Sequence, residues 1–168
     1  MKITFLGTAS CFPTPVRGVS CTALQLENGQ IWLFDCGEGS QVQIQKSNIR
    51  MAKTSKIFIT HLHGDHLFGL PGLLCTLGSQ MSDADRQTRV LDIYGPLGLR
   101  KYITTCLALA RSPLPFKYNI HEMVPDEDQF PPEWNDWQVD HESLDIANPM
   151  EKSSRKISSE IDPVLGER

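Results

Sequence analysis

The sequence predicts a layered α/β fold, because segments with the pattern of strands alternate with segments with the pattern of helices. Length and composition support one globular core: the chain has 168 residues, 40% of them hydrophobic and 21% charged, as in ordinary globular proteins. Its apolar runs are interrupted by glycine and proline, and none approaches the ~20 residues that span a bilayer. We therefore expect no membrane partner.

The first part of the chain has the pattern of three strands. Residues 2–6 alternate in polarity, and residues 20–26 and 31–35 are two β-compatible runs. Asn28-Gly29 lies between these runs, and this dipeptide is a strong hairpin signal because both of its residues accept positive φ. The sequence predicts an N-terminal strand followed by a β-hairpin.

Helices and strands alternate through the middle of the chain. Residues 38–47 fit a short surface helix with a glutamate in its first turn, and residues 57–60 are an apolar run typical of a strand buried on both faces. We expect a glycine-interrupted helix over 67–77, a strand over 90–94 and a helix over 96–110 that begins with proline. These elements complete the predicted α/β layers.

The C-terminal part of the chain differs in composition. Proline and acidic side chains gather near its start, and its end offers only scattered isoleucine, valine and leucine. Such a segment buries little apolar surface. We therefore expect a globular part over 1–125 and a polar, poorly ordered segment over 126–168.

Charge and cysteine content limit the possible functions. Twenty acidic against sixteen basic residues give a net charge of −4, which argues against binding of nucleic acid by overall charge alone. The five cysteines are widely spaced and contain no Cys-x-x-Cys pair. We expect them to be buried, reduced thiols of a cytoplasmic or nuclear protein rather than zinc ligands. The N-terminus lacks the pattern of a signal peptide.

The clearest chemical signature is Thr60-His61-Leu62-His63-Gly64-Asp65-His66, directly after the expected buried strand. Alternate side chains at a strand end share a face, so His61 and His63 can converge on one metal ion, and Asp65 and His66 can turn toward a second. Imidazole and carboxylate ligands without a thiolate suit a catalytic zinc site. The alternative, a set of ordinary polar loop residues, gives no structural reason for four such side chains to gather.

Two metal ions held close together activate a water nucleophile and neutralise charge on a phosphodiester. The motif therefore indicates hydrolysis. Asp65 is the candidate catalytic residue, because it can bind metal and also accept the proton of the nucleophile.

Residues 60–66 match the signature of the metallo-β-lactamase fold, and the chain resembles the short form of ribonuclease Z over about residues 1–125. The segments that carry the narrower resemblance are Phe5-Leu6-Gly7-Thr8, Phe34-Asp35-Cys36-Gly37-Glu38-Gly39-Ser40-Gln41, Leu67-Phe68-Gly69-Leu70-Pro71-Gly72-Leu73-Leu74 and Ile93-Tyr94-Gly95-Pro96. The resemblance implies an αβ/βα sandwich flanked by helices. This chain would hold its N-terminal half, with an incomplete second half.

The resemblance also implies a function. Ribonuclease Z is a zinc-dependent endoribonuclease that removes the 3′ trailer from precursor tRNA, with two Zn²⁺ ions per complete active site and a homodimer as the complete protein. By this resemblance His61 and His63 would bind the first zinc, Asp65 and His66 would bind the second, and Asp65 would accept the proton.

Two further residues leave alternatives open. By the resemblance, Asp35 would receive the N–H of a metal-binding histidine; the alternative is a turn or helix-capping aspartate. Arg17 lies in the segment Pro13–Gly18, which resembles the family's substrate-facing loop. Its guanidinium would contact a phosphate, or Arg17 would be an ordinary exposed arginine.

The family's remaining ligands, two histidines and a bridging aspartate, and its tRNA-binding arm have no counterpart in this sequence. His121 and His141 lie in other contexts, and we interpret both as ordinary surface or core histidines. We therefore expect the chain alone to be inactive. The alternatives are another metallo-β-lactamase-fold hydrolase and a non-catalytic truncated module that pairs with a full-length subunit.

A two-sheet sandwich that lacks one half would leave one face of its sheet uncovered. We expect the residues of that face to come from among Phe5, Leu24, Leu26, Ile31, Leu33, Ile57 and Ile59.

Overall fold

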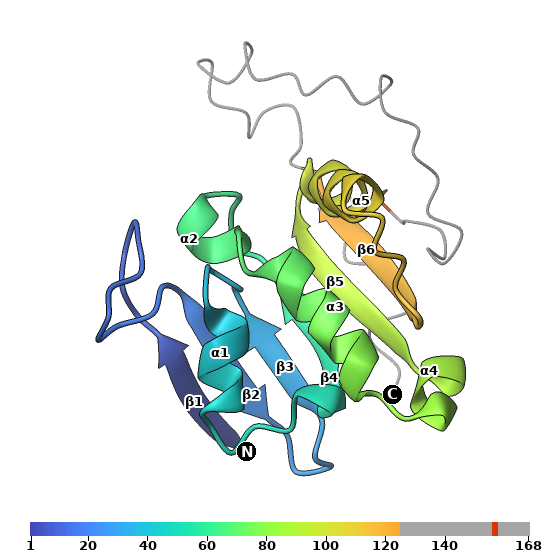
Figure 1. The fold of residues 1–168 in the computed structure, drawn as a ribbon, viewed down its shortest axis with the longest axis horizontal. Coiled ribbons are helices and arrows are strands. Elements are labelled where there is room, and N and C mark those ends of the chain that lie inside the picture. The colour runs from blue at the N-terminus through green and yellow to red at the C-terminus, as the bar shows by residue number, and fades with distance from the viewer. Residues whose placement is uncertain (125–155, 158–168) are drawn as a thin grey trace.

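The computed structural model describes residues 1–124 and 156–157. In these residues seven strands form one sheet in the order of the chain (Figure 1). The strands are β1 Lys2–Gly7, β2 Cys21–Gln25, β3 Ile31–Phe34, β4 Thr54–Phe58, β5 Val90–Pro96, β6 Lys117–Met123 and β7 Lys156–Ile157. The pairs β1–β2 and β2–β3 are antiparallel, and every later pair is parallel. The predicted α/β class and hairpin are confirmed.

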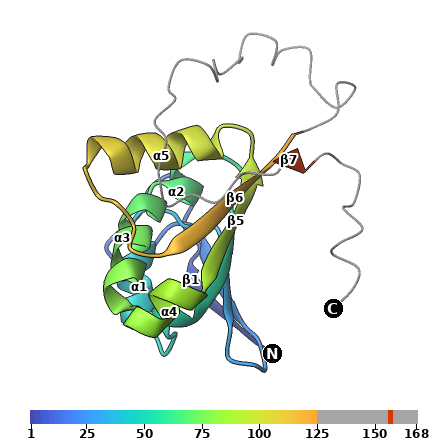
Figure 2. The same ribbon diagram turned by 90° about the vertical axis from the view of Figure 1, so that its right-hand side faces the viewer.

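The helices gather on one face of this sheet, as the edge-on view of Figure 2 shows. They are α1 Ser40–Gln45, the 3₁₀ turn η1 Met51–Lys53, α2 Gly64–Leu67, α3 Leu70–Gln80, α4 Asp83–Thr88 and α5 Leu99–Leu109. None of the helices in the described residues is long and apolar enough to cross a membrane.

The core lies between the sheet and these helices. On the sheet side it is formed by alternate residues of the central strands, such as Leu33, Ile57 and Ile93, and on the helix side by residues such as Leu74 and Ile103. All five are fully buried, and each contributes roughly 1.5–3 kcal/mol by leaving water.

The opposite face of the sheet carries two rows of side chains that cross the strands in register. The first row contains Phe34, Phe58, Tyr94 and His121, and the second contains Trp32, Lys56, Asp92 and Asn119. In the first row, the Phe34 and Phe58 rings and the Phe58 and Tyr94 rings are stacked with centroids 5.0 Å apart. Because the ring faces contact one another, the edges of the rings point away from the sheet.

The expectation for the uncovered face was wrong for its most hydrophobic members. Ile31, Leu33, Ile57 and Ile59 are all buried on the helix side. A strand that is apolar on both sides shows no period of two in its sequence, so the sequence did not reveal which side the helices would cover.

Helix boundaries also differ from the prediction. The helix expected over 67–77 is two helices, α2 and α3, separated at Phe68 and Gly69. The helix expected from residue 96 begins at Leu99 instead, because Pro96 still pairs with Met123 in the sheet and Gly98 has a φ of 100°. The turn Met51–Lys53, helix α4 and strand β6 were not predicted.

Strand β6 had a usable signal that the prediction missed. Tyr118 and Ile120 point into the core, while Asn119 and His121 lie on the opposite face. This alternation is the pattern of a strand with two different faces.

The C-terminal segment 126–168 was expected to be poorly ordered. Apart from residues 156–157, this segment lies outside the described residues, so the expectation stays a prediction.

Candidate metal centre

The histidine motif lies where three parallel strands end. After β4 the chain stays anchored to its neighbours: the Asp35 N–H donates to the carbonyl of Phe58 at 2.8 Å, and the Ile59 N–H donates to the carbonyl of Tyr94 at 2.7 Å. The Ile59 side chain is buried in the core and so anchors the start of the loop that carries the histidines. The loop then turns into the short helix α2, which begins at Gly64.

This turn brings three possible metal ligands together. His61, His63 and Asp65 each offer one ligand atom, and these atoms lie within 4.8 Å of one another. The rings of His61 and His63 meet edge to face, with centroids 4.7 Å apart. Two imidazoles and a carboxylate, with no thiolate among them, form a donor set that fits a catalytic zinc ion.

His66 lies beside this group and contacts it through Asp65. Its Nε2 is 3.6 Å from Oδ2 of Asp65, and its ring centroid is 4.0 Å from that of His61. Its Nδ1 is 2.7 Å from Oδ2 of Asp35. The sequence suggested two separate ligand pairs, whereas the structure joins Asp65 to His61 and His63 and leaves His66 between the two aspartates.

Asp35 holds several parts of the site at once. The residue is buried, and its backbone adopts a left-handed conformation with a φ of 60°. Its Oδ1 accepts hydrogen bonds from the backbone N–H and the hydroxyl of Thr60, both at 2.9 Å, and its Oδ2 accepts one from the Ser20 hydroxyl at 3.1 Å. With His66 included, this carboxylate has more partners than a simple turn aspartate requires.

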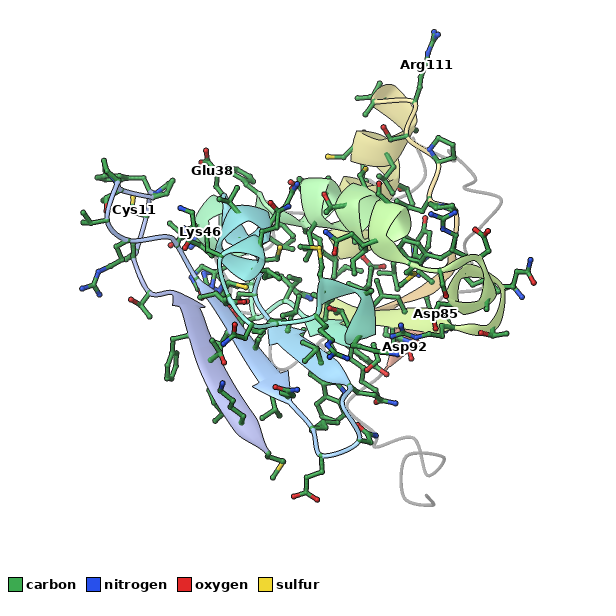
Figure 3. All side chains as sticks on the ribbon, turned by 60° about the horizontal axis from the view of Figure 1, so that its bottom comes forward. Cys11, Glu38, Lys46, Asp85, Asp92 and Arg111 are labelled. Carbon is green, nitrogen blue, oxygen red and sulfur yellow. The ribbon has the colours of Figure 1, made fainter. Side chains whose placement is uncertain are left out.

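Asp65 is held by a segment far away in the sequence. The backbone N–H of Cys11 donates to Oδ2 of Asp65 at 2.8 Å. That hydrogen bond lowers the pKa of Asp65; burial opposes this effect, and the nearby His66 and His61 add to it. Cys11 belongs to the loop after β1, which extends beyond the sheet (Figure 3).

Arg17 lies in the same loop. Its Nη1 donates to the Thr8 hydroxyl at 3.0 Å, and its backbone forms a tight turn with Thr14. Arg17 itself is exposed. The structure thus places Arg17 and the contact to Asp65 in one loop, although it brings the guanidinium to Thr8 rather than to the histidine motif.

Comparison with known proteins identifies the family. The sequence model of the family described as anti-Pycsar protein Apyc1 matches residues 1–90, more than half of the chain. The chain belongs to this family.

Individual relatives in this comparison have names related to ribonuclease Z. The chain is 51% identical to human zinc phosphodiesterase ELAC protein 1 over 133 residues, which are 79% of this chain and 36% of the relative. It is 50% identical to the ribonuclease Z of Prochlorococcus marinus (strain MIT 9312), over 73% of this chain and 38% of the relative. The resemblance to ribonuclease Z is confirmed, and the chain spans little more than a third of these relatives' length.

Solved structures agree with the sequence comparison. The crystal structure of the short form of human tRNase Z (ELAC1) matches with a TM-score of 0.71 and 50% identity, over 79% of this chain and 49% of that one. The metallo-β-lactamase-fold protein YhfI from Bacillus subtilis matches with a TM-score of 0.50 and 21% identity, over 60% of this chain and 40% of that one. The metallo-β-lactamase fold is confirmed.

Three residues that hold the motif in place were not predicted from the sequence. Ser20 and Thr60 bind Asp35 through their hydroxyls, and Cys11 binds Asp65 through its backbone. Thr60 directly precedes the first histidine and could have been noticed from the sequence. The contacts of Ser20 and Cys11 depend on the path of the chain between distant segments, and no local pattern indicates them.

The cysteines behave only partly as expected. All five are free thiols, and Cys21 and Cys36 are buried, but Cys11 is exposed. Cys11 lies in the loop after β1, outside the core, and Cys75 and Cys106 are only partly buried. Burial raises the pKa of Cys21 to about 11.

Proposed function

We propose that this chain is part of a zinc-dependent endoribonuclease that removes the 3′ trailer from precursor tRNA by phosphodiester hydrolysis. The observation that carries the proposal is the convergence of ligand atoms from His61, His63 and Asp65 within 4.8 Å. The identity of 51% to a protein named zinc phosphodiesterase supports the metal and the type of bond. The name ribonuclease Z of further relatives supports the RNA substrate.

The proposed complete active site holds two zinc ions. We propose that His61 and His63 bind one ion, and that Asp65 and His66 contribute to the second. Zinc bound here would polarise a water molecule and neutralise negative charge on the phosphodiester. The donor set suits this role because catalytic zinc sites commonly have three imidazole or carboxylate ligands and keep a further position for water or substrate.

Asp65 is the proposed proton acceptor. Its pKa is lowered from the ordinary aspartate value, so the carboxylate is ionised at neutral pH as in other aspartates. Its oxygens are therefore available to accept a proton. The Cys11 N–H holds one of its oxygens in place. Asp35, through its 2.7 Å contact with His66, is proposed to orient that ring, as acceptors beside metal-binding histidines commonly do.

The proposed substrate is precursor tRNA, and Arg17 is the proposed contact to one of its phosphates. The net charge of −4 implies that RNA binding depends on such local contacts, together with parts of the complete protein beyond this chain. We further propose a homodimer as the complete enzyme, acting in the cytoplasm or nucleus, and the globular unit over 1–125 as its metal-binding portion.

The test joins this chain to the portion of human ELAC protein 1 that lies outside the match. The purified chimera is incubated with zinc and a precursor tRNA carrying a 3′ trailer, beside the 168-residue chain alone. We expect the chimera to release the trailer and the chain alone to release none. His63→Ala and Asp65→Ala should each abolish cleavage by the chimera while its circular dichroism spectrum is kept.

Three outcomes would contradict parts of this proposal. A folded, zinc-loaded chimera that cleaves a thioester or a small phosphodiester but no precursor tRNA would favour a different hydrolase of this fold. Near-normal cleavage by either variant would refute the ligand assignment. Cleavage by the chain alone would show that the site is complete without further ligands.

A further inference from the structure

The contact with Asp35 decides which ring nitrogen of His66 carries a proton. Its Nδ1 lies 2.7 Å from Oδ2 of Asp35. An ionised carboxylate accepts hydrogen bonds and cannot donate them, so the proton between these atoms belongs to Nδ1 of the histidine. In neutral His66 the other nitrogen, Nε2, is therefore the one without a proton.

In the described residues no carboxylate lies at Nδ1 of His61, and the partner of this nitrogen is Thr60. The Thr60 Oγ1 is 3.0 Å from Nδ1 of His61 and 2.9 Å from Oδ1 of Asp35. Two oxygens at the second distance need a proton between them, and only the hydroxyl can supply it because the ionised carboxylate has none. The single hydroxyl proton of Thr60 is thus committed to Asp35.

Because the Thr60 hydroxyl donates its proton to Asp35, it also decides which ring nitrogen of His61 is protonated. The Thr60 oxygen has only lone pairs left to offer to His61, so the hydrogen bond between them requires a proton on Nδ1 of the ring. We propose that Thr60 is a positioning residue that fixes His61 in the tautomer with its proton on Nδ1. Asp35 is the common acceptor that orients both histidines, one directly and one through the Thr60 hydroxyl.

In the metal-free chain, the Nε2 atoms of His61 and His66 are therefore both unprotonated. A neutral imidazole binds metal through its unprotonated nitrogen, and a ring held in one tautomer need not exchange its proton first. The function of this device rests on the metal site proposed above. The tautomer itself is a property of the metal-free chain and does not depend on RNA cleavage.

Thr60 allows a clean test, because its backbone and its side chain act separately. The Thr60 backbone N–H also donates to Oδ1 of Asp35, at 2.9 Å, and this bond remains when the side chain changes. The residue is exposed, so a hydrophobic side chain of the same shape creates no buried cavity. Thr60→Val removes only the hydroxyl, and Thr60→Ser keeps it.

The experiment measures the histidine tautomers of the ¹⁵N-labelled full chain by long-range ¹H–¹⁵N correlation spectra. The sample is kept free of metal with a chelator, at a pH at which free histidine is neutral. We expect His61 to carry its proton on Nδ1 in the wild type and in Thr60→Ser, and to shift toward a proton on Nε2 in Thr60→Val. His66 should keep its proton on Nδ1 in all three.

Zinc affinity provides the second readout, measured by competition with a chromophoric chelator. We expect Thr60→Val to bind zinc about 10–100-fold more weakly, as for other residues that orient metal ligands, and Thr60→Ser to stay within about threefold of the wild type. A merely structural role would lower the melting temperature of Thr60→Val without moving the tautomer.

A wild-type His61 with its proton on Nε2 would overturn the proposal, and this measurement does not depend on whether any variant folds. An unchanged tautomer in folded Thr60→Val would overturn it as well. If the tautomers behave as expected but the chimera described above cleaves no precursor tRNA, the proposed function fails while the assignment of Thr60 stands.

Discussion

Gly37 packs directly against the backbone of Asp65. A Cβ atom on Gly37 would overlap with the Asp65 carbonyl oxygen, and a Cβ on Gly69 would overlap with the Gly37 carbonyl in the same way. Two hydrogen bonds hold these segments together: the Cys36 N–H donates to the His66 carbonyl at 2.8 Å, and the Gly69 N–H donates to the Cys36 carbonyl at 2.9 Å. The segment after β3 therefore packs against the backbone of the histidine motif and holds it in position.

Gly37→Ala should separate these segments. We expect a loss of roughly 2–4 kcal/mol in the free energy of unfolding, because the added methyl group meets backbone rather than a flexible side chain. Urea unfolding in the presence of a chelator measures this loss without a contribution from metal. The control is Gly29→Asn, at a hairpin position with a φ of 83° where an added Cβ would meet no atom within 4 Å beyond the adjacent residues and where asparagine is tolerated. Equal losses in the two variants would refute this account.

Arg17→Ala should affect a large substrate more than a small one. In the active chimera we expect kcat/KM to fall about tenfold on precursor tRNA, which is the value of a single charge-assisted contact to phosphate. On a small phosphodiester that does not reach the loop, kcat/KM should stay unchanged. Lys46→Ala, which removes a surface charge at the end of α1 (Figure 3), is the control. An equal fall on both substrates would assign Arg17 an ordinary structural role.

The buried Cys21 thiol should make the fold less stable in alkali. Burial raises its pKa from 9.0 to about 11, so between these values the unfolded chain loses the proton and the folded chain keeps it. This difference favours the unfolded state as pH rises. Stability that is fully present below pH 9 should fall by about 2–3 kcal/mol by pH 11.

Denaturant unfolding at a series of pH values, under reducing conditions, measures this effect. Cys21→Ala is the comparison, because it lacks the titrating thiol but keeps Cys36 and the tyrosines. Its stability should decline less steeply than that of the wild type between pH 9 and 11. Parallel curves for the two proteins would show that the Cys21 thiol does not contribute.

The sheet face opposite the helices should make the isolated chain self-associate. Ile3 and Phe5 point from β1 with exposed fractions of 61% and 72%, beside the aromatic rows of β3 to β5. Large apolar faces and open sheet edges favour association. We expect size-exclusion chromatography to show oligomers that increase with concentration.

A pair of charge substitutions tests whether this face is responsible. Phe5→Lys combined with Ile3→Lys should shift the chain toward monomer, whereas Val16→Lys should not. Val16 is the matched control because it is 96% exposed but lies in the loop after β1. A wild-type chain that remains a monodisperse monomer, or a Val16→Lys variant as effective as the pair, would contradict the prediction.

Local patterns in the sequence were sufficient for the class of the fold and for the motif. The Asn28-Gly29 turn and the alternating or continuous apolar runs depend on neighbouring residues, so they gave the first strands and most of the helices. The spacing of His61, His63, Asp65 and His66 depends only on six consecutive residues of the chain. A local signal in β6 was present but was obscured by the prolines that surround it.

The sequence by itself thus determined the alternation of strands and helices and the position of the histidine motif. Only the tertiary structure decided which face of the sheet the helices cover, where the helix after the motif breaks, and which residues hold the motif. The Asp35 contact to His66 spans 31 residues, and the Cys11 contact to Asp65 spans 54. Such contacts form because the sheet brings the ends of separate strands to one edge, and this arrangement results from the packing of the whole chain.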